Sequence, residues 1–327
     1  MDPKLRKLIE QRLRRKFGSH GVLYGKDTPK VPETAEREYR RLVNAYIGLV
    51  KKALEAELAK LRETYRETRE AAKADAPMPE QSGESATDLM LAIAAAFTMA
   101  ENSLTVQTNL FDLTNRMNRL ANLTRKLTVR EWKRAIRATL AIDIREDYYL
   151  GEFFQEQLDA WVEENVDLIK TFPHDCLSKM RDIVYDGYVN GRTTTQMTKD
   201  IQRVYSVDKR RARFIARDQV AKLNSQITQA QQRDAGVEEY VWSTVEDERV
   251  RYCHRELNGQ TFRWDEPPEM WTPIMKNKMV VGRAYTGRHC HPGEDFQCRC
   301  VAIPVFKREG MNLPVDEDAL TMTITVK

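Results

Sequence analysis

The sequence predicts an α+β protein: a mainly α-helical N-terminal part followed by a small C-terminal α+β module that is rich in loops. Two observations indicate this class. Before Gly236, apolar residues recur at a helical spacing among charged residues, with few interruptions. After Gly236, short stretches alternate apolar and polar residues and contain β-branched or aromatic side chains, as strands do.

The amino-acid composition is typical of a soluble protein of a reducing compartment. Of the 327 residues, 41% are hydrophobic and 31% are charged, and the net charge is only +4, which suits a soluble protein with a core. The chain has no run of 18 apolar residues, so we expect no membrane span. The basic N-terminus lacks the apolar core of a secretion signal. Five cysteines, an odd number, fit a reducing cytoplasm better than a disulfide framework.

Helical patterns dominate the N-terminal part. A basic amphipathic helix is expected over residues 1–17, a loop rich in Gly and Pro over residues 18–32, and a long charged helix from about Thr34 to Lys73. Residues 74–87 have the composition of a linker. The next series of helices begins near Asp88.

Three further helices are expected after Pro173. The first covers residues 174–190 and the second covers residues 193–205. The third begins at Asp208, which is a plausible N-cap, and Gly236 closes it.

Short strands are expected after the last of these helices. They cover residues 239–244, 260–264 and 299–305, and the tail adds a possible strand over residues 321–326. Residues 265–297 are rich in Pro and Gly and have no clear period, so we expect a loop there. The chain is thus expected to have four consecutive parts: an N-terminal helical arm (1–74), a helical domain (88–172), the C-terminal module (173–306) and a tail (307–327).

Cysteine and histidine are crowded into one stretch of the C-terminal module. Zinc prefers four thiolate or imidazole ligands, and a long loop needs something to fix it. The spacing does not match a zinc finger, however, and the same residues could pack as small apolar groups and hydrogen-bonding imidazoles. The residue pattern slightly favours packing and leaves a zinc site open. The candidate ligands are Cys253, His254, Cys290, His291, Cys298 and Cys300.

Catalysis is the weaker interpretation of this stretch. A Cys and a His could form a nucleophile and its base, and His254 with Asp247 or Glu256 could serve a metal-dependent nuclease. No spacing typical of a hydrolase or metalloprotease accompanies them. We therefore expect no enzymatic activity and assign no catalytic residue.

The helix that is expected to begin at Asp208 is unusually basic. It could contact the phosphates of a nucleic acid, and the basic helix at residues 1–17 repeats that signal. Its charges could equally be solvated or paired with Asp208 and Asp218. The candidate residues for contact with DNA or another polyanion are Lys209, Arg210, Arg211, Arg213, Arg217 and Lys222.

An ordered set of motifs resembles the head morphogenesis domain of the phage Mu protein F-like family. The run from Arg211 to Val220, followed by Lys222-Leu-Asn224, resembles the helix that opens this domain. The resemblance covers about residues 175–306, whereas the N-terminal half is only loosely similar. The later motifs are Gly236-Val-x-x-Tyr240-x-Trp242-x-Thr244, Asp247-Glu-Arg-Val-Arg251-x-x-His254-x-x-Leu257-x-Gly259-x-x-Phe262 and His291-Pro-Gly-Glu-Asp-Phe-Gln-Cys298-Arg-Cys300.

The resemblance implies a minor head protein of a bacteriophage. Such proteins are made in the host cytoplasm, join the procapsid with the portal protein, and help to build or mature the head. The implied partners are the portal protein and other capsid or scaffold proteins, with several copies in the virion head and no membrane. Some relatives are packaged with the genome, so a DNA-binding packaging or ejection factor is the alternative. A metal-dependent nuclease is a more distant one.

The resemblance also implies roles for individual residues. The Asp, the His and the paired Cys of the family correspond here to Asp247, His254, Cys298 and Cys300. This sequence departs from the family in its additional Cys253, His289 and Cys290, and in an inserted-looking segment around residues 271–282. The extra candidates leave open which four groups would hold a metal. The structural residues of the motif are expected to be Asp247, Arg249, Arg251, Gly259 and Arg299.

Overall fold

A computed structural model describes residues 3–75, 83–190 and 192–318. It has a helical N-terminal part and a small C-terminal sheet, so the predicted α+β class is confirmed. The chain forms two compact units, each built from separated segments. Unit 1 comprises Met1–Arg37, Asn118–Val162 and Ala216–Lys327, and unit 2 comprises Glu38–Met117 and Glu163–Ile215. The four consecutive parts expected from the sequence remain a prediction.

The helices follow the expected order. The basic N-terminal helix and the long charged helix are both present, and the helix after the linker begins at Gly83 rather than near Asp88. Among the described residues, no helix combines the length and the apolar character needed to cross a membrane. The helices are α1 (Pro3–Phe17), α2 (Glu33–Asp75), α3 (Gly83–Leu110), α4 (Leu113–Leu140), α5 (Glu146–Leu150), the 3-10 turn η1 (Glu152–Phe154), α6 (Gln155–Ile169), α7 (Phe172–Val189), α8 (Thr194–Asp234) and α9 (Tyr252–Leu257).

The expected break before Asp208 is wrong. Residues from Thr194 to Asp234 form one continuous helix, α8, because this stretch contains neither Gly nor Pro. Asp208 therefore does not cap a helix but lies buried in the middle of one, where it bonds with the thiol of Cys176. Burial and this carboxylate raise the pKa of Cys176 to about 12.

Gly236 ends α8 as expected. Its φ of +73° lies in the left-handed region. The amide of Val237 donates to the carbonyl of Gln232, and the amide of Gly236 donates to that of Arg233. These two bonds form a Schellman motif, which satisfies carbonyls at the end of the helix and turns the chain into the sheet.

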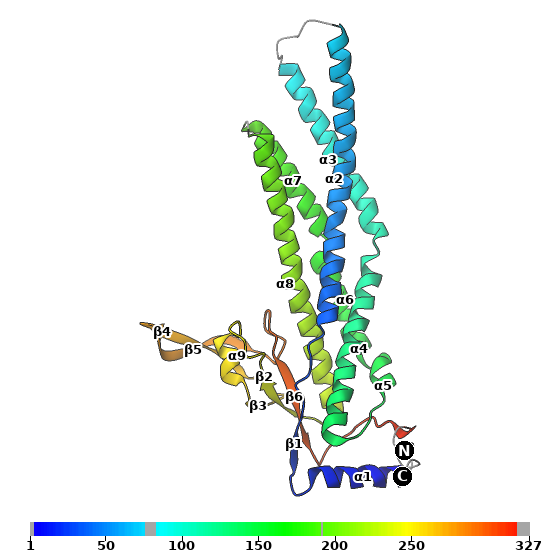
Figure 1. Ribbon diagram of the computed structural model, residues 1–327, viewed down its shortest axis with the longest axis vertical. Helices are drawn as coiled ribbons and strands as arrows, with labels where there is room; N and C mark the ends of the chain where they lie inside the picture. The colour runs from blue at the N-terminus through cyan, green and yellow to red at the C-terminus, as the bar shows by residue number, and fades with distance from the viewer. Residues whose placement is uncertain (1–2, 76–82, 191, 319–327) are drawn as a thin grey trace. The chain divides into compact units, whose positions relative to one another are not determined.

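Unit 1 contains an antiparallel four-stranded sheet in the order β1-β6-β2-β3 (Figure 1). Its strands are β1 (Val22–Tyr24), β2 (Glu239–Ser243), β3 (Thr261–Arg263) and β6 (Val301–Lys307). The sequence predicted β2, β3 and β6. It missed β1, which is only three residues long within a Gly/Pro-rich loop and is recognisable only through its pairing with β6.

A second, two-stranded sheet contradicts the expected loop over residues 265–297. It is the hairpin of β4 (Glu269–Lys276) and β5 (Met279–His289), which Figure 1 shows extending beside α9. The turn residues Asn277 and Lys278 have positive φ, as in a type I′ turn, but without the usual Gly. Most of its side chains are exposed, so no alternation marked these strands in the sequence. The expected strand at 321–326 lies outside the described residues.

The C-terminal half of α8 holds the C-terminal module in unit 1. The indole of Trp264 donates to the side chain of Gln232 at 3.0 Å. The hydroxyl of Ser225 donates to the carbonyl of Pro292 at 2.7 Å. In unit 2, the hydroxyl of Tyr39 on α2 donates to Asn165 on α6 at 2.6 Å.

Replacement of Gly236 by Ala should destabilise unit 1. A Cβ at this position would lie 1.9 Å from the carbonyl oxygen of Gly310, and the positive φ disfavours any side chain. We expect the free energy of unfolding to fall by about 3 kcal/mol. The measurement is urea denaturation followed by tryptophan fluorescence, since all five tryptophans belong to unit 1.

Gly21→Ala is the matched control. A Cβ there meets no atom within 4 Å, so its denaturation midpoint should equal that of the wild type. Equal midpoints for both variants would contradict the tight packing of Gly236 against Gly310.

Candidate functional site

An apolar cluster encloses the candidate site in unit 1. Trp242 on β2 and Trp264 after β3 are buried within it, together with the cysteines of the module. Because the cluster excludes water, any polar group inside it needs partners from the protein. Its buried members are Tyr240, Trp242, Cys253, Trp264, Met270, Cys298, Cys300 and Ala302.

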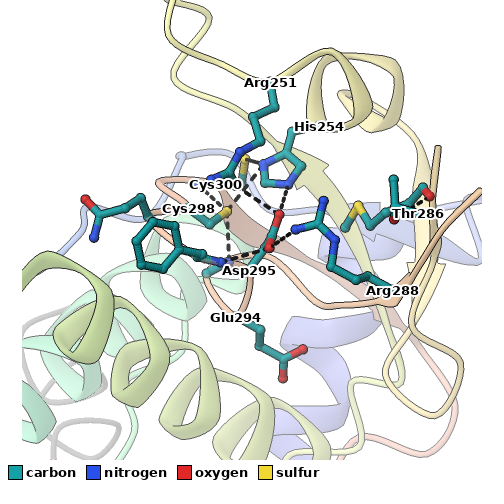
Figure 2. A network of polar contacts seen from close by, with 12 residues as sticks. Arg251, His254, Thr286, Arg288, Glu294, Asp295, Cys298 and Cys300 are labelled. Atoms are coloured by element: carbon teal, nitrogen blue, oxygen red, sulfur yellow. Dashed lines mark hydrogen bonds and ion pairs between the residues drawn. The ribbon is translucent and has the colours of Figure 1, made fainter. Parts of the chain in front are cut away.

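His254 on α9 contacts the two cysteines just before β6. Its Nδ1 atom lies 3.6 Å from the sulfur of Cys298 and 3.5 Å from the sulfur of Cys300. Figure 2 shows both sulfur atoms close to the imidazole ring. All three side chains are buried, and their ligand atoms lie within 4.8 Å of one another. The sequence predicted these three residues as metal ligands, and the fold brings them together.

Asp295 fixes the other side of the imidazole. Its Oδ2 atom lies 3.0 Å from His254 Nε2 and 2.9 Å from the guanidinium of Arg251. Its Oδ1 atom accepts from the guanidinium of Arg288 at 2.5 Å and from the amide of Phe296 at 2.9 Å. Since a carboxylate accepts, Nε2 carries a proton, and Nδ1 is left to face the sulfur atoms.

These contacts set the charges in the site. Burial by itself raises the pKa of Asp295. The bond to His254 and the charges of Arg251 and Arg288 outweigh this effect and lower the pKa below its usual value, so this carboxyl is ionised. Burial likewise disfavours the charged imidazole of His254. The bond to Asp295 and the contacts with the neighbouring thiols outweigh that effect and raise the pKa of His254 to about 11.

The pKa values of Cys298 and Cys300 shift in opposite directions. The bond from Cys300 lowers the pKa of Cys298 well below its usual value, against the effect of burial. The same bond, followed by burial, raises the pKa of Cys300. The amides of Gly293 and Cys300 also donate to the sulfur of Cys298, each at 3.4 Å. Cys298 thus accepts hydrogen bonds from several donors, and this favours the thiolate form at Cys298 rather than at Cys300.

The geometry of this group fits a tetrahedral metal such as Zn²⁺. Two ligands of one zinc, a thiolate and an imidazole, lie about 3.6 Å apart, because the bonds are about 2.3 and 2.0 Å long. The two sulfur-to-Nδ1 distances have this value. The contact of His254 with Asp295 is the outer-shell partner that a metal-binding histidine usually has. The described cluster supplies three ligands.

The other three candidate ligands lie outside this group. Cys253 is buried beside His254 in the apolar cluster, and Cys290 packs against that cluster. His291 is buried against Trp264, with ring centroids 4.9 Å apart, and its Nδ1 lies 2.9 Å from the hydroxyl of Tyr240. Burial lowers the pKa of His291, which favours its neutral form.

The motif residues anchor the segments around the site. Asp247 accepts from Arg299 at 2.6 Å and from the amide of Arg249 at 3.1 Å, so it lies apart from the metal-type cluster. Arg251 reaches Asp295 instead. Gly259, with a φ of +78°, makes the turn before β3, and its amide donates to the carbonyl of Trp242.

Sequence reasoning missed Asp295 and Arg288. Asp295 lies in the same motif as His291 and Cys298, but nothing in the spacing distinguishes it from the adjacent Glu294. Only burial does so, because Asp295 is 5% exposed and Glu294 is more accessible.

The basic residues of α8 divide into paired and unpaired groups. Lys209 lies over the ring of Tyr205, and Arg211 lies over that of Phe172. Two more form ion pairs: Arg217 with Glu36 at 3.6 Å and Lys222 with Asp218 at 2.9 Å. Within the described part of the chain, the exposed Arg210 and Arg213 have no such partner.

Comparison with known proteins identifies this module. A model of the family described as phage Mu protein F like protein matches residues 178–303, which include the whole cluster. The match covers less than half of the chain, so the similarity to this family holds for this segment. The predicted resemblance is thereby confirmed for this segment.

The match to a curated relative is partial. An uncharacterized protein of Haemophilus influenzae (strain ATCC 51907 / DSM 11121 / KW20 / Rd) is 37% identical over 150 residues, which are 46% of this chain and 30% of that protein. The chain therefore matches less than a third of the length of this relative. No solved structure matches the chain.

Replacement of Asp295 by Asn should loosen the module. The change removes the charge that pairs with Arg251 and Arg288 and holds His254, and it leaves these cations without a counter-charge. The two arginines are partly exposed, so the loss is mainly that of the charge-assisted hydrogen bonds, about 1.5–3 kcal/mol of unfolding free energy. Urea denaturation followed by tryptophan fluorescence measures the loss.

Asp265→Asn tests the same chemistry at the surface. Asp265 pairs with Arg263 in solvent, so this variant should unfold like the wild type. A similar loss of unfolding free energy in both variants would contradict the claim that the burial of Asp295 makes its charge important for stability.

Proposed function

We propose that this chain acts as a minor head protein in bacteriophage head morphogenesis, located in the virion head and assembled in the host cytoplasm. The observation that carries the proposal is the phage Mu protein F like domain over residues 178–303. The partners we propose are the portal protein and other capsid or scaffold proteins, with several copies in each virion.

A structural role for the Cys/His cluster supports assembly rather than catalysis. His254, Cys298 and Cys300 are only 3%, 2% and 5% exposed, so a substrate has no approach to them in this conformation. They join α9 to the segment before β6. We therefore propose that the cluster fastens the module and that the domain has no enzymatic activity. Plasmid cleavage with Mg²⁺ or Zn²⁺ that is lost in His254→Ala would contradict this.

We also propose that the fastening includes a zinc ion. His254 Nδ1 and the sulfur atoms of Cys298 and Cys300 would hold it, and Asp295 would orient the imidazole. The bound ion would cross-link the two segments and replace the protons that the cluster otherwise carries.

Metal analysis of the purified full chain tests the zinc proposal. We expect about one zinc per chain, and its loss in the double variant Cys298→Ser/Cys300→Ser, because two of the three ligands are then gone. Cys290→Ser, outside the group, should keep the metal. Absence of zinc from wild-type protein purified without chelators would contradict the proposal.

Contact with DNA is a second part of the proposed function. It is supported by the exposed Arg210 and Arg213 on α8, which have no anionic partner among the described residues, and by the exposed basic residues of α1. We expect a salt-dependent gel shift with duplex DNA. The double variant Arg210→Ala/Arg213→Ala should weaken it and reduce its salt dependence, whereas Arg308→Ala, another exposed arginine, should not. No shift at low salt would exclude this role.

Incorporation into heads tests the assembly role itself. The chain should be found in purified phage heads and should co-purify with the portal protein of the same phage. Its absence from heads, or normal head formation when its gene is deleted, would contradict the proposal. Neither result depends on DNA binding or on zinc.

A further inference from the structure

The tip of the β4–β5 hairpin exposes a group of large apolar side chains. Met279 is 66% exposed, and Val281 is 57% exposed. Such an apolar group on one short element is typical of an interaction surface. The exposed members are Ile274, Met275, Met279, Val280 and Val281, with Lys276 and Lys278 at the turn.

The hairpin tip has the shape of an inserting element. Met279 and Val280 are consecutive in β5 and pair in regular register with Lys276 and Met275, so they lie on opposite faces of the hairpin. A flat partner surface would cover only one of them, whereas a groove covers both. The type I′ turn at Asn277 and Lys278 gives the tip a defined form.

The same module contains a groove of about 800 Å³. Its apolar wall includes Phe262, Leu257 and Trp271. Three of its carboxylates, those of Glu256, Glu266 and Glu269, have no cationic partner within the described ranges. β3, which contributes to the wall, is an edge strand of the sheet. On this edge the carbonyl of Arg263 accepts from the amide of Glu266, and the rest of the edge can accept a further strand.

We propose that the hairpin tip of one copy of this chain inserts into this groove of a second copy. The two surfaces are complementary: the tip is apolar with Lys276 and Lys278, and the groove is apolar with acidic residues that outnumber its two arginines, Arg263 and Arg283. Neither lysine has an anionic partner among the described residues. Docking would therefore bury the apolar side chains of the tip and bring its lysines to the glutamates of the groove.

The contact must join two copies rather than close within one. Trp271 and Arg283, near the base of the hairpin, line the groove of their own copy. The tip lies about 16 Å further along the strands, at ~3.3 Å per residue from Trp271 to Lys276. The tip of a paired hairpin cannot return to its own base. The resulting contact is head-to-tail, so it builds rings or chains of copies.

Sedimentation velocity of the full chain tests the proposal. We expect association that increases with protein concentration. The double variant Val280→Asp/Val281→Asp should be monomeric, because charge replaces the inserted apolar side chains. Val106→Asp, at a valine on α3 that is 58% exposed, should associate like the wild type. A wild-type monomer at all concentrations, or undiminished association of the tip variant, would overturn the proposal.

A charge exchange separates docking from misfolding. One variant reverses the groove (Glu256→Lys/Glu266→Lys), and another reverses the tip (Lys276→Glu/Lys278→Glu). Each alone should associate at least tenfold more weakly than the wild type. Mixed together they should associate again, since every tip then meets a groove of opposite charge. Failure of the mixture to associate, with both variants folded by circular dichroism, would refute the contact. The outcome is independent of the proposed role in the phage head.

Discussion

The C-terminal module depends on one buried carboxylate. Asp295 lies among apolar side chains, where an isolated charge would be strongly unfavourable. It is compensated by His254 from α9, by Arg251 just before that helix and by Arg288 near the end of β5. Because these partners come from two segments, α9 with its N-cap and the end of β5, satisfying this one charge fixes the two segments relative to each other.

The fastening continues through the residues that follow Asp295. The amide of Gln297 donates to Asp218 on α8 at 2.9 Å, and Arg299 reaches Asp247. Between them, Cys298 contacts His254. Side chains and backbone of one short segment therefore contact α8, α9 and the loop after β2. The ordered motifs of the sequence are therefore a set of mutual anchors.

The sequence pattern predicted the elements whose burial leaves a regular order of apolar residues. Strand β2 alternates between buried and partly exposed residues, β6 is a nearly continuous buried run, and β3 follows the turn at Asn258-Gly259, so these strands were recognisable. The β4–β5 hairpin is exposed on both faces and left no pattern. Asp208 resembles a cap by residue type, but its role is set by Cys176, a contact distant in sequence. Of the site, chemistry identified His254, Cys298 and Cys300, whereas Asp295 required the fold.

The central claim is that this cluster holds the module together. Hydrogen exchange of the full chain, compared between wild type and Cys298→Ser/Cys300→Ser, tests it most directly. We predict faster exchange in α9 and in residues 290–300 of the variant, with unchanged exchange in α7 of unit 2. Equal protection of α9 and of residues 290–300 in the two proteins would contradict the claim.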